Sequence, residues 1–293
     1  MNLALTVLNI TAPVFLLAAI GYAWVRLGFE YRMEFVTRLA MTLAVPCLIF
    51  VALMETEIDP AALADLSVAA LVAYLLVGAA FFGVVRLLKL NSQTYLAPLI
   101  FGNTGNLGLP LALFAFGETG LSYAVVVFAV MAILSFTIGI WMVAGAGSFL
   151  RVLREPLVGA TLLGALFLWQ GWETPEALTN ALRLIGQMAI PLMLITLGVA
   201  VARLKTGAIG LAIALAVVKV ALCTAAAWAV ATWFALDPVA AAVLILQVAT
   251  PVAVTSYMLA EKYGADAQKV AGLVVTSTLL SVITLPLILS FVI

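Results

Sequence analysis

The sequence has no histidine, and charged side chains make up only 9% of its 293 residues. A soluble domain has about 25% charged residues, so this composition argues against a water-soluble fold. The lack of histidine excludes imidazole-based zinc sites, Ser-His catalytic triads and histidine proton relays. The formal net charge is zero, which argues against nucleic-acid binding because that needs a basic surface.

Cysteine is also scarce. The two cysteines, Cys47 and Cys223, lie in apolar runs and are not spaced as metal ligands. We expect buried thiols rather than a disulfide. The sequence therefore predicts no metal site and no cofactor. It also offers no pair of acids placed for catalysis, so an intramembrane enzyme is not expected.

Apolar residues, by contrast, are abundant: 66% of the residues are hydrophobic, and the mean hydropathy is +1.28. A run of about 20 apolar residues is long enough to span a bilayer as a helix. The first run lacks a basic start and a small-residue cleavage site, so we interpret it as a retained helix. Ten spans are predicted, at 5–27, 35–54, 62–88, 92–116, 121–146, 156–172, 177–201, 207–234, 238–260 and 267–292.

The links between the spans differ in charge on the two sides of the membrane. The links after the odd-numbered spans, with the adjoining helix ends, hold 11 of the 13 basic residues. The opposite links hold Arg183 alone and are otherwise acidic, with residues such as Glu55 and Glu118. By the positive-inside rule, both termini are predicted to lie outside.

The two halves of the sequence resemble each other. Residues 38–50 match 183–195 at an offset of 145, and residues 13–30 match 156–173 at an offset of 143. Chance similarity between apolar helices is the alternative, but the matches include residues with special backbone or charge properties. They are Pro13 with Pro156, Gly21 with Gly164, Gly28 with Gly171, Glu30 with Glu173, Arg38 with Arg183 and Pro46 with Pro191.

The repeat and the charges together predict an all-α polytopic membrane protein built from two inverted repeats. Each half holds five spans, an odd number, so the second half enters the membrane from the opposite side. This is the plan of many secondary transporters. The predicted organisation is a first five-helix repeat at 1–146, a cytoplasmic link at 147–155 and a second, inverted repeat at 156–293.

The fourth and ninth spans carry residues that interrupt helices. Residues 101–110 hold three glycines, two asparagines and a proline. Pro110 leaves the carbonyl of Asn106 without its helical partner, and Pro251 does the same for Gln247. Thr104 aligns with Thr250 at an offset of 146, so the breaks occupy equivalent places. Simple kinks are the alternative, but paired interruptions in corresponding spans point to a transport site. The second of these breaks, at Thr250 and Pro251, lies in the ninth span, 238–260.

The direction of the two spans indicates what the site binds. After each break a new half-helix begins near mid-membrane, and a helix N-terminus has free N–H donors and partial positive charge. Asn103 and Asn106 add amide donors on one face. The arrangement favours a small organic anion, most simply a carboxylate. Thr104, Pro110, Thr250 and Pro251 complete the candidate site.

Lys219 lies near the middle of the eighth span, where a charge costs about 3 kcal/mol or more. It could neutralise a bound anion or hold the place of a coupling cation; pairing with free carbonyls is the structural alternative. Gln187, Thr42, Gln247 and Thr255 could line the site. For Gln187 and Thr42 the role we favour is to satisfy the carbonyls freed by Pro191 and Pro46.

No Asp or Glu lies in the middle of any predicted span, and Asp65 comes nearest. Carriers coupled to protons or sodium commonly keep a buried carboxylate. The coupling ion therefore stays open, as does facilitated diffusion. The alternatives are a sodium- or proton-coupled symporter or exchanger of another substrate, and a channel.

At these motifs the chain resembles the auxin efflux carrier family, which includes plant PIN-formed carriers and bacterial organic-acid carriers. The similarity extends over essentially all ten spans. The motifs that carry it are Asn103–Leu111 with Gly117 and Gly120, Ala249–Val254 with Ala260 and Tyr263-Gly264, Leu43–Pro46, Ile190–Leu192 and Lys219.

The resemblance implies a fold like that of bile-acid-type sodium symporters, with crossed broken helices. Spans 1, 2, 6 and 7 would form a scaffold domain, and spans 3–5 and 8–10 a transport domain. It implies elevator-type alternating access, a homodimer, a place in the bacterial inner membrane, and a crossover site at Asn103, Asn106, Pro110, Thr250 and Pro251. Bacterial members are linked to malonate, malate and similar carboxylates.

Overall fold

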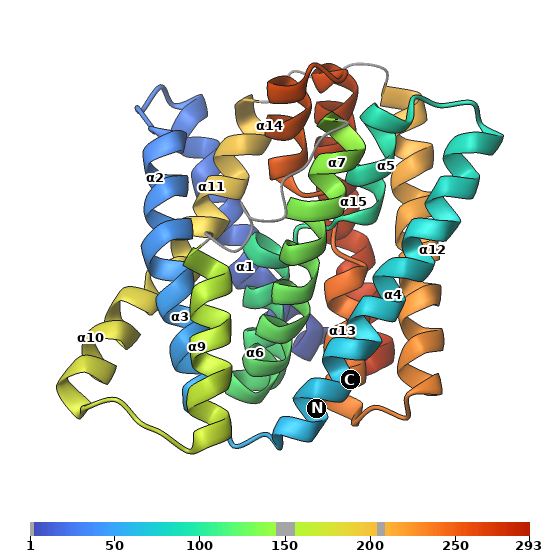
Figure 1. Cartoon of the computed structure of the whole chain (residues 1–293). Coiled ribbons are helices and arrows are strands. Elements are labelled where there is room, and N and C mark those ends of the chain that lie inside the picture. The colour runs from blue at the N-terminus through green and yellow to red at the C-terminus, as the bar shows by residue number, and fades with distance from the viewer. Residues whose placement is uncertain (1–2, 145–155, 204–208) are drawn as a thin grey trace.

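The computed structural model describes residues 3–144, 156–203 and 209–293 (Figure 1). Every element in these ranges is helical, which confirms the all-helical prediction. Seven helices in the described part of the chain are long and apolar enough to cross a membrane, and two shorter apolar helices accompany them. The predicted link 147–155 lies outside the described residues.

Each described helix overlaps a predicted span, and the helix at Leu109–Leu134 overlaps both the fourth and the fifth. In the first half they are α1 (Leu3–Arg26), α2 (Met33–Leu39), α3 (Val45–Met54), α4 (Pro60–Leu87), α5 (Ser92–Ile100), α6 (Leu109–Leu134) and α7 (Ile140–Ala144). Wider π-helical turns connect some of them: η1 (Ala40–Ala44), η2 (Thr104–Gly108) and η3 (Ser135–Gly139). In the second half they are α9 (Pro156–Gln170), α10 (Glu176–Gln187), α11 (Ala189–Arg203), α12 (Ile209–Trp233), α13 (Pro238–Val248), α14 (Val254–Tyr263) and α15 (Ala267–Val292).

Local sequence explains where two of these helices begin. An Asp-Pro pair precedes both α4 and α13. The carboxylate of Asp59 accepts a hydrogen bond from the N–H of Ala61 at 2.9 Å, and that of Asp237 accepts one from Val239 at 2.9 Å. Proline fits the first helical position because its missing N–H would be unpaired there anyway.

The helical run Thr104–Ala144 is a hairpin. Its 41 residues would measure about 60 Å as one straight helix, twice the thickness of a hydrocarbon core. The chain instead turns at Gly117, which has φ 65° and ψ −154°. A Cβ on Gly120 would lie 2.6 Å from the carbonyl oxygen of Ala112, so the chain has folded back on itself. Two helices therefore occupy this run.

Left-handed backbone recurs in pairs between the two halves. The pairs among the described residues are Gly28 with Gly171 (φ 87° and 63°), Lys89 with Ala235 (51° and 48°) and Gly117 with Gly264 (65° and 75°). Their offsets of 143, 146 and 147 agree with those of the sequence repeat. Corresponding links of the two halves thus place a residue with positive φ at matching positions, although ψ differs between Gly117 (−154°) and Gly264 (20°).

A pair of glycines shows the same correspondence in packing. A Cβ on Gly21 of α1 would collide with the carbonyl oxygen of Ile195 in α11. A Cβ on Gly164 of α9 would lie 3.3 Å from the carbonyl oxygen of Phe50 in α3. Gly21 matches Gly164 in the repeat, and Phe50 matches Ile195. Equivalent helices therefore approach each other through equivalent residues.

The helices pack in two groups. In the first group, α1 packs along α11, and α3 packs against α9 and α10. In the second, α12 packs against α15, α13 and α4, while α4 also packs against α5 and α6. Contacts between the groups are fewer and run mainly from α1, α3 and α11 to α6, η2 and α15.

Candidate functional site

Two extended segments from opposite halves of the chain cross in the second group of helices. They follow α5 and α13, at residues 101–103 and 250–253. Gly102 pairs with Val252 in an antiparallel bridge. The N–H of Asn103 donates to the carbonyl of Pro251 at 2.7 Å, and the N–H of Ala253 points to the carbonyl of Phe101 at 3.5 Å. Backbone groups left over by the two broken helices thus satisfy each other, as an apolar membrane interior requires.

Glycine permits this close crossing. A Cβ on Gly102 would collide with the side-chain oxygen of Thr250, and a Cβ on Gly108 would collide with the side chain of Gln247. Both glycines lie in the glycine-rich stretch that the sequence singles out. Their role here is close approach between backbones and side chains of the two halves.

The structure shifts the first break relative to the predicted position. The extended segment ends at Asn103, and helical structure begins at Thr104. Pro110 lies in the first turn of α6, directly after η2. Pro110 therefore does not mark the break, since it lies within the continuous helical run that begins at Thr104 and only removes one N–H from it. The pairing of Gly102 with Val252 also lies four residues away from the offset of 146 that aligns Thr104 with Thr250.

Asn103 and its neighbour offer unused polar atoms at the crossing. The side chain of Asn103 is only 5% exposed, and its Nδ2 atom has no hydrogen-bond partner among the described residues. The Oγ1 atom of Thr104, which is fully buried, has none there either. A buried donor without a partner costs free energy, so it marks a place where a ligand can bind. Asn106 is partly buried, one turn further on.

Most of the polar groups that the second half brings to the crossing are paired, but Oε1 of Gln247 has no hydrogen-bond partner among the described residues. The hydroxyl of Thr250 donates to the carbonyl of Gln247 at 2.7 Å. The N–H of Val252 donates to Oγ of Ser277 at 3.0 Å, and Nε2 of Gln247 reaches the carbonyl of Ala124 at 3.4 Å. Sequence reasoning missed Ser277. The available signal was a hydroxyl in the middle of the last apolar span.

Lys219 is fully buried in α12. Its Nζ donates to the carbonyl of Leu99 at 2.8 Å and lies 3.9 Å from Sγ of Cys223. Leu99 is in the last turn of α5, where carbonyls lack helical partners and the helix dipole is negative. The contact is therefore the carbonyl pairing that the sequence left as one alternative, and it ties α12 to the end of the broken helix.

Four predicted lining residues are separated in space. Gln247 is fully buried beside the crossing. Thr42 is exposed, and its hydroxyl donates to the carbonyl of Arg38 at 2.8 Å. Thr255 is exposed on α14. Gln187 is also exposed and lines a separate cavity. Only Gln247 joins Asn103, Thr104, Thr250 and Pro251 at the crossing.

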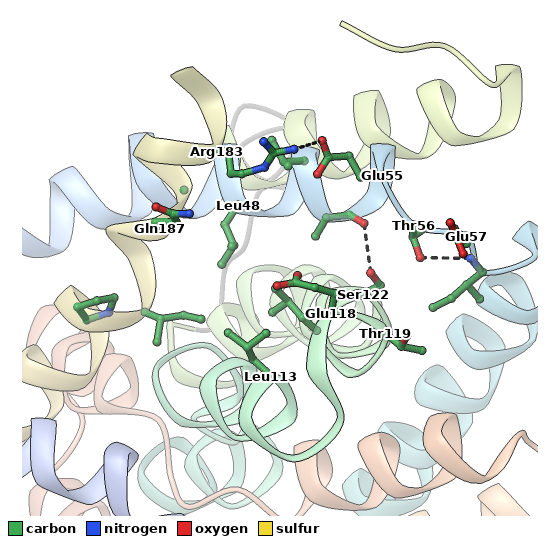
Figure 2. A pocket seen from close by; sticks show the side chains of 17 residues that line it. Leu48, Glu55, Thr56, Glu57, Leu113, Glu118, Thr119, Ser122, Arg183 and Gln187 are labelled. Atoms are coloured by element: carbon green, nitrogen blue, oxygen red, sulfur yellow. Dashed lines mark hydrogen bonds and ion pairs between the residues drawn. The ribbon is translucent and has the colours of Figure 1, made fainter. Parts of the chain in front are cut away.

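The cavity that Gln187 lines has a volume of about 820 Å³. One wall comes from α3, the link after it, and the junction of α10 with α11 (Figure 2). The other wall comes from the hairpin around Gly117, with Leu113, Glu118 and Ser122. Leu113 lies two helical turns, about 10 Å, beyond Asn106 on the same helix face. The cavity thus opens between the two groups of helices, on the side of Asn106 away from the crossing.

Comparisons with known proteins agree with this architecture. A protein of Rhizobium meliloti (strain 1021) named "Putative malonate transporter" is 25% identical, over 94% of this chain and 92% of its own length. The model of the family described as "Membrane transport protein" matches residues 6–152 and again residues 146–289. The chain therefore belongs to this family of membrane transport proteins, the auxin efflux carrier family that its motifs resemble.

Proposed function

We propose that this membrane transporter is a secondary carrier for small carboxylate anions. The observation that carries the proposal is the buried, unpaired amide of Asn103 where two half-helices begin. Amide donors and helix N-termini suit a carboxylate because both present N–H groups without adding an acidic proton. Asn103, Thr104 and Asn106 would bind the anion, while Pro110, Thr250 and Pro251 shape the crossing.

The transport mechanism we propose uses ten membrane spans in two inverted repeats. The matched left-handed turns and the matched glycine contacts of α1 and α9 support this layout. The start of α1 and the end of α15 lie at the same end of the molecule in Figure 1, as an even number of spans requires. We place both termini outside a bacterial inner membrane, on the basis of the charged links.

Alternating access would come from an elevator movement of one group of helices past the other. The group containing α1, α3 and α11 would be the scaffold and would form the homodimer. The group containing the crossing would move. Two observations support this assignment. Helices of different groups contact each other less than helices of the same group do, and a cavity separates the two groups on one side.

Lys219 would support the site as a fixed positive charge. Its ammonium already occupies the carbonyl end of α5, a position where broken-helix carriers often bind a coupling cation. We therefore propose transport that does not require sodium at this position. A sodium- or proton-coupled carrier of another substrate is the alternative on the same fold.

Uptake into proteoliposomes tests the proposal. The purified protein would be reconstituted and offered labelled malonate, malate and acetate, with and without sodium and a proton gradient. We expect saturable uptake of at least one carboxylate that persists in sodium-free buffer. Uptake that depends strictly on sodium would favour the alternative, and uptake of none of these acids would overturn the substrate class.

A further inference from the structure

The cavity between the two groups of helices contains one basic side chain among its described lining residues, Arg183 of α10. Its Nη2 atom forms an ion pair with Oε1 of Glu55 at 2.5 Å. Glu55 belongs to the link after α3, so the pair joins two separate elements across the cavity wall (Figure 2). The side chains of Arg183 and Glu55 are 45% and 39% exposed, so solvent and solutes reach both.

The guanidinium is held in position from its other side. Nη1 of Arg183 donates to Oδ1 of Asn180, one turn earlier on α10, at 3.0 Å. Gln187, one turn later on the same helix face, also lines the cavity and adds an amide. Asn180 thus orients the guanidinium of Arg183. Its other partner, the carboxylate of Glu55, is half-exposed and therefore open to exchange.

The matched arginine of the first half shows what is special about Arg183. Arg38 pairs with Glu34 on its own helix at 2.9 Å, and both side chains are more than 70% exposed. That pair is an ordinary surface contact between residues four positions apart. Arg183 instead finds its partner 128 residues away in the sequence, at a cavity.

We propose that Arg183 recognises the carboxylate of the transported anion in this cavity, and that Glu55 occupies the guanidinium until the substrate replaces it. The inference rests on the proposed function and adds a first binding position on the route to Asn106. Arginine binds carboxylates through two parallel N–H donors. Exchange of one carboxylate for another keeps those donors satisfied, and a half-exposed ion pair contributes little stability that would oppose it.

The remaining charges of the cavity restrict the ligand. Glu57 and Glu118 also line it, and neither forms an ion pair with a described residue. These two carboxylates repel a second negative charge on the ligand. The site therefore favours a compact anion with a single charged carboxylate over a dianion of the same size. Monomethyl malonate and malonate form a matched pair of probes for this preference.

The test compares R183Q, R183K, E55Q and E57Q with the wild-type protein in proteoliposomes of one orientation. For monomethyl malonate offered at the face that carries Glu55, we expect R183Q to raise KM about tenfold, as loss of a charge-assisted hydrogen bond does. R183K should have an intermediate effect, and the KM measured from the opposite face should not change. E55Q should lower KM because the competing carboxylate is gone.

E57Q is the matched control, since it removes one charge from the same cavity but no partner of Arg183. An E55Q effect larger than the E57Q effect supports exchange at Arg183. Equal effects, or an R183Q protein with the wild-type KM, would overturn the inference while wild-type uptake still upheld the proposed function. If R183Q fails to insert into the membrane, the KM of E55Q compared with that of E57Q decides whether the substrate replaces Glu55 at Arg183. Absence of uptake by the wild-type protein would reject the proposed function itself.

Discussion

The two halves of the molecule place positive φ angles at corresponding links but carry different charges. Gly28 and Gly117 have left-handed counterparts in Gly171 and Gly264. The charged residues do not follow this pattern. Lys219 is buried in α12, whereas the position that matches it at the offset of 146 is Ala73, which is buried in α4 without any charge. The repeat therefore determines the path of the chain, while differences between the repeats determine the polarity of the site.

The crossing shows the same division of roles. The first half brings an unpaired amide at Asn103, and the second brings hydroxyls that are already bonded within it, at Thr250 and Ser277. The unpaired donor that we propose for the anion thus comes from the first half, while these hydroxyls of the second half are bonded within it. Substitutions on the two sides should separate these roles.

The largest effect is expected from Gly102→Ala, which puts a methyl group against Thr250. Overpacking of this kind typically costs about 1–3 kcal/mol, and here it also forces the two segments apart, so transport should be lost. A melting curve and an uptake assay measure both effects. Gly83→Ala is the control, because a Cβ there meets nothing within 4 Å. Thr250→Ala added to Gly102→Ala should recover part of the stability, and wild-type behaviour of Gly102→Ala would contradict the close crossing.

The next largest effect is expected from the Asn103→Ala/Asn106→Ala double variant. Because the Nδ2 of Asn103 has no hydrogen-bond partner among the described residues, the change should leave the melting temperature nearly intact. Carboxylate uptake should fall by tenfold or more, the equivalent of about 1.4 kcal/mol of binding or more. Asn91→Ala is the matched control: Asn91 caps α5 through Thr94 at 3.1 Å, so its loss should lower stability and spare affinity. Unaltered uptake by the double variant would remove Asn103 and Asn106 from the site.

Lys219→Met tests what the charge contributes that Lys219 has and its counterpart Ala73 lacks. Methionine keeps much of the volume but removes the charge and the hydrogen bond to Leu99. We expect uptake to fall about tenfold while stability holds or rises, since a buried charge without an acidic partner is costly. Lys262→Met, at an exposed position of α14, should change neither quantity. If stability and uptake fell together in Lys219→Met, a purely structural role would follow.

The smallest effect is expected on the melting temperature, from substitutions at the turns around Gly117 and Gly264. In the second turn, Asp266 accepts a hydrogen bond from the N–H of Lys269 at 3.1 Å and pairs with its ammonium at 2.8 Å. Hydrogen bonds from the Lys269 side chain and backbone lower the pKa of the Asp266 carboxyl. A lowered pKa stabilises the fold above the unfolded value, about 3.9, and this contribution is lost as the pH falls below it.

Asp266→Asn should therefore lower the melting temperature slightly at pH 7, and by less at pH 3. Glu118→Gln is the comparison at the first turn, where the carboxylate faces the cavity instead. An equal loss at both pH values for Asp266→Asn would show that helix capping, rather than charge, is what Asp266 contributes.

The fold was largely predictable because bilayer thickness makes each span a long apolar run. The hairpin at Gly117 illustrates this: residues 104–144 form nearly continuous helix, yet their length and the glycine required two spans. The prolines misplaced the first break. Pro110 lies within the helical run that begins at Thr104, whereas the close approach of Gly102 to Thr250 is a tertiary contact that no local pattern reveals.

Candidate site residues were predictable in kind but not in grouping. Asn103 and Thr250 stood out as polar residues in apolar spans, and the crossing brings their segments together. Thr42 and Gln187 stood out for the same reason but lie elsewhere, because helical position decides which way a residue faces. The pairing of Arg183 with Glu55 joins residues 128 apart, and only the packing of α3 against α10 creates it.

The crossing has a consequence for the synthesis of this protein. The N–H of Asn103 finds its acceptor at Pro251, roughly half the chain later. At about 5–20 residues per second, a ribosome takes roughly 7–30 s to make that stretch. During this time the extended segment after α5 has no partner from the second half, although lipid tolerates no unpaired backbone. The segment 101–103 therefore needs protein or water to satisfy its backbone until residues 250–253 arrive, and a chain that stops before residue 250 would never form the crossing.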